Sequence, residues 1–181
     1  MLNLNQYLLI DKATPGDGPQ IVELLKSRAI DLQRKGSKQW GFLLTGQEDE
    51  EILELVAKGS FYKVNVTSNH LNQAAPAPQA AATFMLSDTQ EEWDVHLWGQ
   101  EDAQGTVYLH KLAVALEYKG EGLGDYLVGW IKQHVEELGY DKIRLDCVAG
   151  SEKLREFYET HEFKLLDIVD AHCLYEWEAK R

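Results

Sequence analysis

Residues 106–124 read TVYLHKLAVALEYKGEGLG, and they contain the clearest structural pattern in the sequence. The run from Thr106 to Ala115 is rich in β-forming residues and predicts a strand. The glycine cluster Gly120–Gly124 follows almost at once, and Leu127 and Ile131 then continue an apolar stripe at helical spacing. Glycines let consecutive backbone N–H groups turn toward one point, and a helix N-terminus adds positive potential there. The strand, turn and helix therefore favour binding of a phosphate or pyrophosphate.

The glycine cluster also has a simpler interpretation as a tight turn between a strand and a helix. It lacks the Gly-Lys-Ser/Thr ending of a Walker loop, and its Gly-x-Gly-x-Gly spacing differs from the dinucleotide fingerprint. Taken in isolation, the cluster does not decide between a structural turn and a phosphate site.

The rest of the chain predicts a single α/β domain over residues 7–178. Between the predicted elements, Asp88–Gly105 has two interpretations: a solvated, partly extended connection, or a connection that includes a strand at Asp94–Trp98. The predicted order is a strand (7–12), helices (19–36 and 48–58), strands (61–67 and 80–86) joined by a hairpin loop (68–79), the strand and helix of the opening stretch, a strand (143–148), a helix N-capped by Ser151, and strands (165–169 and 172–177).

Several motifs together resemble the GCN5-related N-acetyltransferase (GNAT) superfamily. They are Leu112-Ala113-Val114, the run Lys119–Gly124, Leu145-Asp146-Cys147 and the run Leu154–Glu159. The resemblance covers Tyr7 to Trp177 and implies a mixed central sheet of about seven strands flanked by about four helices. It also implies that two central strands splay apart to form a cleft for coenzyme A (CoA).

The resemblance implies that acetyl-CoA is bound mainly by backbone groups. Main-chain groups near Leu112 and Val114 would hold the pantetheine arm, and a β-bulge amide would polarise the thioester carbonyl. Three positions depart from the family pattern: Lys119 replaces Arg or Gln, Ser151 replaces Asn, and Glu162 replaces Gly. The implied cofactor-binding residues are Leu112, Ala113, Val114, Lys119, Gly120, Glu121, Gly122, Leu123, Gly124 and Ser151.

Tyr158 matches the tyrosine that protonates the departing CoA thiolate in this family, although a packed helix-face tyrosine would show the same spacing. His110 is the candidate general base, because histidine in general titrates with a pKa of about 6.5. A packed, hydrogen-bonded strand histidine is the alternative for His110. The rival bases in the preceding segment are Glu91, Glu92, Asp94 and His96.

The cysteine and histidine content points to a reduced, cytoplasmic protein without a metal. Cys147 and Cys173 form no CxxC pair, and Cys147 is expected to be a small buried hydrophobe rather than a nucleophile. The six histidines lack the spacing of zinc ligands. Met1–Asp11 has no basic region before an apolar run, so no signal peptide is expected. The uncharged run 64–87 contains too many Asn, Gln and Pro residues to span a membrane.

The formal net charge of −12 argues against nucleic acids and anionic membranes as partners, since both recruit basic surfaces. Acidic residues concentrate in 48–54 and 88–102, outside the expected cofactor motifs. They predict a cationic amine acceptor, with aromatic side chains supplying cation–π contacts. The predicted acceptor-binding residues are Trp40, Trp93, Asp94 and Trp98.

The sequence therefore predicts an acetyl-CoA-dependent N-acetyltransferase in which the amine attacks the thioester directly. A non-catalytic CoA-binding regulatory or interaction module with the same fold is the main alternative, and acyl transfer to a hydroxyl is a third. A homodimer is compatible with each of these functions.

Overall fold

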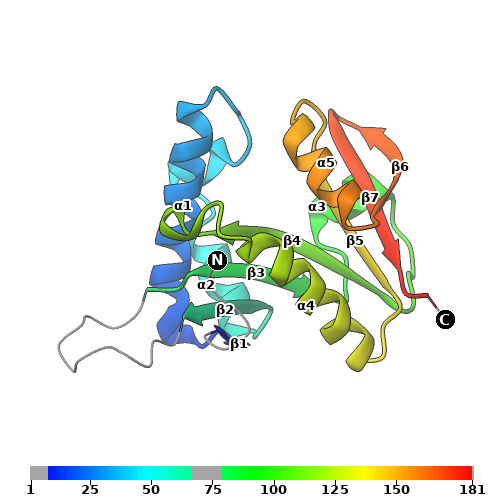
Figure 1. Cartoon of the computed structure of the whole chain (residues 1–181), viewed down its shortest axis with the longest axis horizontal. Coiled ribbons are helices and arrows are strands. Elements are labelled where there is room, and N and C mark those ends of the chain that lie inside the picture. Colours follow the sequence, from blue (N-terminus) through cyan, green and yellow to red (C-terminus); the bar gives the residue numbers. More distant parts are fainter. Residues whose placement is uncertain (1–7, 67–78, 181) are drawn as a thin grey trace. The chain divides into compact units, whose positions relative to one another are not determined.

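The computed structural model describes residues 8–66 and 79–180. Its strands form one mixed seven-stranded sheet in the order β1-β2-β3-β4-β5-β7-β6 (Figure 1). The strands are β1 (Leu8–Lys12), β2 (Phe61–Val66), β3 (Ala82–Ser87), β4 (Thr106–Val114), β5 (Lys142–Val148), β6 (Lys164–Val169) and β7 (His172–Glu178). The α-helices are α1 (Gly18–Arg34), α2 (Asp49–Ala57), α3 (Glu92–Trp98), α4 (Leu123–Glu137) and α5 (Glu152–Thr160).

The pairing of the strands confirms the predicted α/β class. The pair β4–β5 is parallel, whereas β1–β2, β2–β3, β5–β7 and β6–β7 are antiparallel. Of the predicted hairpin loop, residues 68–78 lie outside the described residues, as do Tyr7 of the first predicted strand and Thr67 of the strand predicted at 61–67. No helix within the described ranges is long and apolar enough to cross a membrane.

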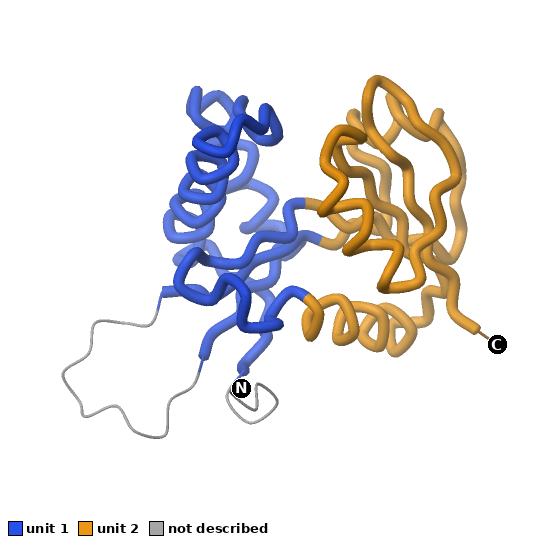
Figure 2. The backbone as a smooth tube through the Cα atoms, turned by 45° about the horizontal axis from the view of Figure 1, so that its top comes forward, with its two compact units in different colours: residues 1–85, 111–124 blue, residues 86–110, 125–181 orange. Residues whose placement is uncertain are grey.

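The chain divides into two compact units (Figure 2). Unit 1 comprises residues 1–85 and 111–124, and unit 2 comprises residues 86–110 and 125–181. The strand β4 changes unit between His110 and Lys111, so its first part belongs to unit 2 and its last part to unit 1.

Apolar faces of α1 and α2 build the core of unit 1. Ile21 and Leu25 of α1 and Val56 of α2 are fully buried together with Phe61 of β2. Burial of each such aliphatic side chain stabilises the fold by roughly 1.5–3 kcal/mol. The 3.6-residue period of α1 therefore directs one helix face inward and leaves its other face polar.

In unit 2, side chains alternate across β5. Ile143, Leu145 and Cys147 are buried, while Arg144 and Asp146 on the opposite face are only half-buried. Because successive strand residues point to opposite faces, the sequence RLDC presents two charged residues on one face of the sheet. Asp146 on this face is one of the carboxylates of the candidate site described below.

The segment Asp88–Gly105 differs from both sequence-based interpretations, because residues 92–98 form the helix α3 rather than a strand or an extended connection. Asp94 at the third helical position accepts a hydrogen bond from the Glu91 backbone N–H at 3.0 Å. Asp94 and Leu97, three positions apart, are both buried. A capping box and one inward-facing pair therefore stabilise this short helix.

Candidate active site

The last part of β4, in unit 1, contains an irregularity close to the position where the family resemblance implies a β-bulge. Lys111 has φ 51°, in the left-handed region that non-glycine residues seldom occupy. Leu112 and Val114 are half-buried, while Ala113 between them is buried. Such backbone strain costs of order 1 kcal/mol or more and is concentrated at functional sites.

Earlier in β4, within unit 2, the pairing with β5 is short. The parallel register joins Thr106–Tyr108 to Lys142–Arg144. It does not extend to His110 or to Asp146, although both are described strand residues. This separation agrees with the predicted splaying of the two central strands.

The glycine turn after β4 has open space beside its backbone. Gly120 and Gly122 both have φ 82°, and a Cβ atom built on either would meet nothing within 4 Å. Glycine adopts this conformation without the steric cost that other residues incur. Leu123 then begins α4 and is buried, so it anchors the turn at the helix start.

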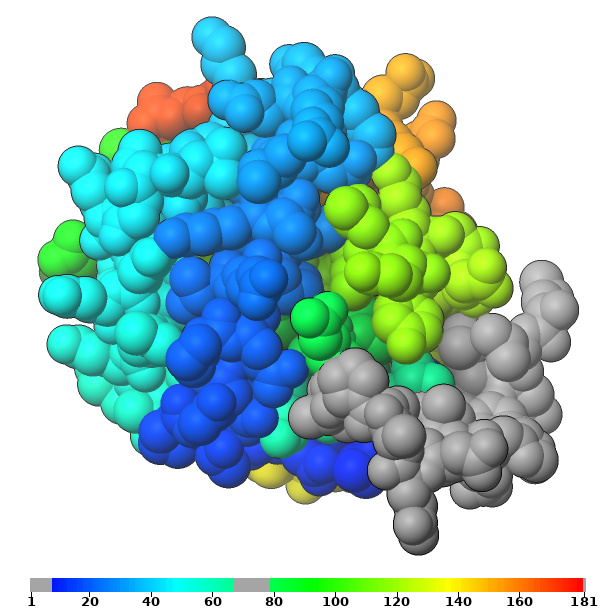
Figure 3. All heavy atoms as spheres, turned by 90° about the vertical axis from the view of Figure 1, so that its left-hand side faces the viewer, coloured from blue at the N-terminus to red at the C-terminus, as the bar shows by residue number. Residues whose placement is uncertain are grey.

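Three cations surround Asp31 of α1 in unit 1. Its Oδ2 lies 3.1 Å from an Arg28 guanidinium nitrogen, 2.5 Å from Lys35 Nζ and 3.4 Å from Lys119 Nζ. The hydrogen bond from Lys35 is the largest cause of a lowered Asp31 pKa. Figure 3 shows the yellow-green segment that includes residues 116–122 beside the blue helix α1.

This cluster, Arg28, Lys35 and Lys119 around Asp31, carries a local excess of positive charge in a chain whose net charge is −12. Of its members, the sequence predicted only Lys119. Arg28, Asp31 and Lys35 follow at intervals of three and four residues, so they share a helix face. This spacing in the sequence indicates that the three side chains lie together on α1. It does not indicate that Lys119 also approaches Asp31.

A buried acid–histidine pair lies in unit 2. His110 Nε2 is 3.0 Å from Asp94 Oδ2, and Asp94 is only 1% exposed. The same Asp94 oxygen accepts the Glu91 N–H, so α3 holds the carboxylate in place. A carboxylate bound to one ring nitrogen of a histidine fixes the ring and leaves the other nitrogen for acid–base chemistry.

A second carboxylate on this face belongs to Asp146. The Trp93 indole N–H donates to Asp146 Oδ2 at 3.4 Å. Burial raises the pKa of Asp146, while the Trp93 hydrogen bond and the charges of His110 and His172 act in the opposite direction. Trp93 also stacks on His96, with ring centroids 5.2 Å apart, and meets the His172 ring edge-on. Sequence reasoning placed Asp146 in a family motif without assigning it a role.

Tyr158 lies on the inner face of α5 in unit 2, with its ring against Phe157, Phe163 and Tyr175. Burial, the largest cause, raises the pKa of its phenol, so the group stays protonated at neutral pH. Burial also raises the pKa of Cys147 to about 12, and this residue is 3% exposed. Cys147 is therefore poorly suited to act as a nucleophile.

Two of the predicted acceptor-binding tryptophans make other contacts. Trp40 packs against the unit 1 core and precedes the 3₁₀ turn Gly41–Thr45. The ring of Trp98 is covered by the Arg144 guanidinium, 4.5 Å from the ring centroid. Trp93 is 42% exposed, so part of its ring is accessible.

The remaining candidates occupy distinct positions. Ser151 caps α5 by accepting a hydrogen bond from Leu154 N at 3.4 Å, as its sequence position predicts. Glu91 and Glu92 stand at the start of α3, where Glu92 is exposed. His96 is on the exposed side of α3, and its Nε2 lies 2.5 Å from Asp170 Oδ2.

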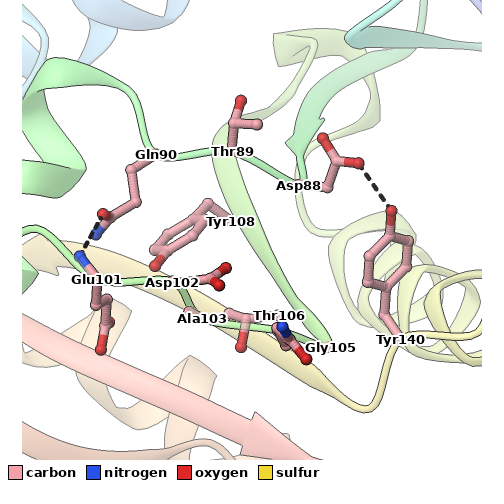
Figure 4. A pocket seen from close by; sticks show the side chains of 11 residues that line it. Asp88, Thr89, Gln90, Glu101, Asp102, Ala103, Gly105, Thr106, Tyr108 and Tyr140 are labelled. Carbon is pink, nitrogen blue, oxygen red and sulfur yellow. Dashed lines mark hydrogen bonds between the residues drawn. The ribbon is translucent and has the colours of Figure 1, made fainter.

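Figure 4 shows a pocket of about 350 Å³ in unit 2, lined by residues that come before and after α3. Gln90 connects the segment before α3 to the segment after it, because its side-chain oxygen accepts a hydrogen bond from the Glu101 N–H at 3.1 Å. Asp88 and Asp102 add carboxylates to the lining, and Tyr108 stands at one wall. No residue assigned to catalysis or cofactor binding from the sequence lines this pocket.

The mixed seven-stranded sheet, the short pairing of β4 with β5 and the glycine turn before α4 agree with the acetyltransferase fold that the resemblance implies. The chain belongs to the acetyltransferase (GNAT) family, whose family model matches residues 28–163. It is 35% identical over 164 residues to YesJ, an uncharacterized N-acetyltransferase of Bacillus subtilis (strain 168), covering 90% of this chain and 85% of that protein.

Solved structures show the same fold. A GNAT-family acetyltransferase from Listeria monocytogenes 4b F2365 is 25% identical and superposes with a TM-score of 0.76, covering 95% of both chains. The PaiA N-acetyltransferase of Thermoplasma acidophilum, in complex with coenzyme A, is 14% identical with a TM-score of 0.68. The match to the PaiA structure covers 95% of this chain and 99% of the PaiA chain. Because only 14% of the residues are identical, this match shows a shared fold and no more.

Proposed function

We propose that this acetyltransferase moves the acetyl group of acetyl-CoA to an amine by direct attack, within one catalytic domain spanning residues 7–178. The observation that carries the proposal is the Asp94–His110 pair, whose oxygen and nitrogen are 3.0 Å apart. An amine attacks only in its neutral form, so the reaction requires a proton acceptor. His110, oriented by Asp94, supplies that acceptor.

The donor side of the reaction rests on unit 1. The backbone at Leu112 and Val114 would bind pantetheine, and the open turn at Gly120 and Gly122 would accept the pyrophosphate. The cations around Asp31 offset the repulsion between a polyanionic substrate and an acidic chain. Family resemblance supports these assignments, and the conformations of Lys111, Gly120 and Gly122 agree with them.

The proton balance of the proposed step is simple. His110 takes one proton from the acceptor ammonium, and the neutral nitrogen forms a bond to the thioester carbonyl carbon. The carbon–sulfur bond then breaks, and Tyr158 protonates the leaving CoA sulfur. The nitrogen loses a second proton as the amide forms, and that proton restores the phenol through solvent. The net products are the amide, CoA thiol and one proton released by His110.

The test is a screen of amine acceptors with acetyl-CoA, followed by detection of free CoA thiol. We expect amine-dependent CoA release, matched by an acetylated product. Calorimetric binding of CoA without transfer to any amine would favour the non-catalytic CoA-binding module instead. Release that depends on alcohols rather than amines would favour acyl transfer to a hydroxyl.

A further inference from the structure

Asp146 is a half-buried carboxylate for which the described residues provide few partners. It lies on the same face of β5 as Arg144 and receives a hydrogen bond from the Trp93 indole N–H at 3.4 Å, which is long for such a bond. Moving a carboxylate away from water is unfavourable unless a charge or several donors compensate it. One distant indole N–H compensates it only in part.

The permanent cation beside Asp146 in the strand is already engaged. Arg144 Nε lies 2.8 Å from Glu176, its guanidinium also pairs with Glu101, and the same group covers the ring of Trp98. The positive charges that act on Asp146 come from His110 and His172 rather than from a lysine or an arginine. Asp94, the other carboxylate near this site, is already hydrogen-bonded to His110.

We propose that Asp146 binds the ammonium group of the acceptor, with the exposed part of the Trp93 ring as an aromatic wall. This inference rests on the proposed N-acetyltransferase function and specifies its acceptor class. The acceptor is an alkylammonium without a carboxylate next to its amine, because two carboxylates already face the site and a third would be repelled. Transfer of one ammonium proton to the neighbouring His110 then yields the neutral amine.

The kinetic test compares wild type with Asp146→Asn, which keeps the shape of the side chain and its ability to accept the Trp93 N–H. For an alkylammonium acceptor, KM is expected to rise about 10- to 100-fold, because a charge-assisted hydrogen bond is lost. The KM for acetyl-CoA should not change. Hydroxylamine, which is uncharged at pH 7.5, should show little difference between the two proteins.

Asp102→Asn is the matched control. Asp102 is exposed and lines the pocket of Figure 4, so this variant removes the same charge from the rival acidic site. We expect its KM for the alkylammonium to stay within about twofold of wild type. An unchanged KM in Asp146→Asn, or a larger rise in Asp102→Asn, would overturn the assignment.

A binding measurement separates this inference from the proposed function. The indole N–H resonance of Trp93, assigned with a Trp93→Phe variant, should shift when the alkylammonium is added to wild type but not to Asp146→Asn. Absence of the shift in wild type contradicts the Asp146 site, whether or not CoA is released. If the shift occurs and no amine releases CoA, the acceptor site stands and the catalytic proposal fails.

Discussion

Asp94 Oδ2 lies 3.0 Å from His110 Nε2, and Asp94 is almost completely buried at 1% exposure. A carboxylate in this position touches the histidine and the Glu91 N–H, so in the proposed mechanism it would orient His110 rather than contact the acceptor. The sequence placed both residues among the candidates and treated them as rivals for one role. The structure brings them together as partners.

Asp94→Asn is expected to lower kcat about 10- to 100-fold, because the amide no longer fixes the His110 ring in one tautomer. The KM for acetyl-CoA should stay the same, and the pH–rate profile should change shape. Steady-state kinetics across pH measure both quantities. Glu92→Gln, at an exposed position of the same helix, is the control and should behave as wild type. A wild-type kcat and a wild-type pH profile in Asp94→Asn would show that Asp94 does not orient the general base.

Tyr158→Phe should reduce kcat by about 100-fold while leaving CoA affinity unchanged, because loss of a general acid affects proton transfer and not binding. Isothermal titration calorimetry with CoA and steady-state kinetics separate the two effects. The aromatic contacts of Tyr158 with Phe163 and Tyr175 are retained by phenylalanine, so the variant should fold. Wild-type turnover would show that another group protonates the leaving thiolate.

Gly122→Glu should abolish measurable CoA binding, because it places bulk and negative charge at the proposed pyrophosphate site. The matched control is Gly139→Glu, which introduces the same side chain at φ 90° with open space beside it, after the other end of α4. Both variants incur similar backbone strain, of order 1 kcal/mol. Calorimetry should therefore detect CoA binding only in the control, and equal affinities in the two would refute the phosphate assignment.

Acid should destabilise the chain partly through Asp17. Burial opposes ionisation of this carboxyl, but hydrogen bonds from Lys63 Nζ and from Thr14 outweigh it and lower its pKa to about 2. A lowered pKa in the folded state contributes stability above the unfolded value of 3.8, and this contribution is lost as the pH falls toward 2. The contribution at neutral pH is about 2 kcal/mol.

Asp17→Asn should therefore reduce the free energy of unfolding at pH 7 and flatten its dependence on pH between about 4 and 2. Urea denaturation at several pH values measures both changes. Asp167→Asn, on the exposed strand β6, serves as the control. An unchanged pH dependence in Asp17→Asn would show that other carboxylates control the acid transition.

The strand, glycine turn and helix around residues 106–137 could be predicted because each depends on local sequence. The spacing of Leu127 and Ile131, the glycines at positive φ and the capping Ser151 are short-range features, and the structure contains them. The helix α3 was missed because seven residues hold too few turns for a periodic pattern. Its capping box was visible only as Glu91 followed three residues later by Asp94.

The chemistry that was missed depends on distant parts of the chain. The Asp94–His110 contact links α3 to β4, and the Trp93–Asp146 contact links α3 to β5. The approach of Lys119 to Asp31 spans 88 positions in the sequence. Composition identified the acidic segments, but only tertiary structure distinguishes a buried positioning carboxylate from a solvated one.

Transfer of a labelled acetyl group distinguishes direct attack by an amine from transfer through an acetyl-enzyme. The protein is mixed with acetyl-CoA carrying a deuterated acetyl group and an alkylammonium acceptor, then sampled by rapid quench and mass spectrometry. We expect the label to appear on the amine in step with CoA release, with no labelled enzyme at any time and with both rates reduced in the His110→Ala variant. A labelled enzyme intermediate, or CoA release without labelled amine, would contradict direct transfer to an amine.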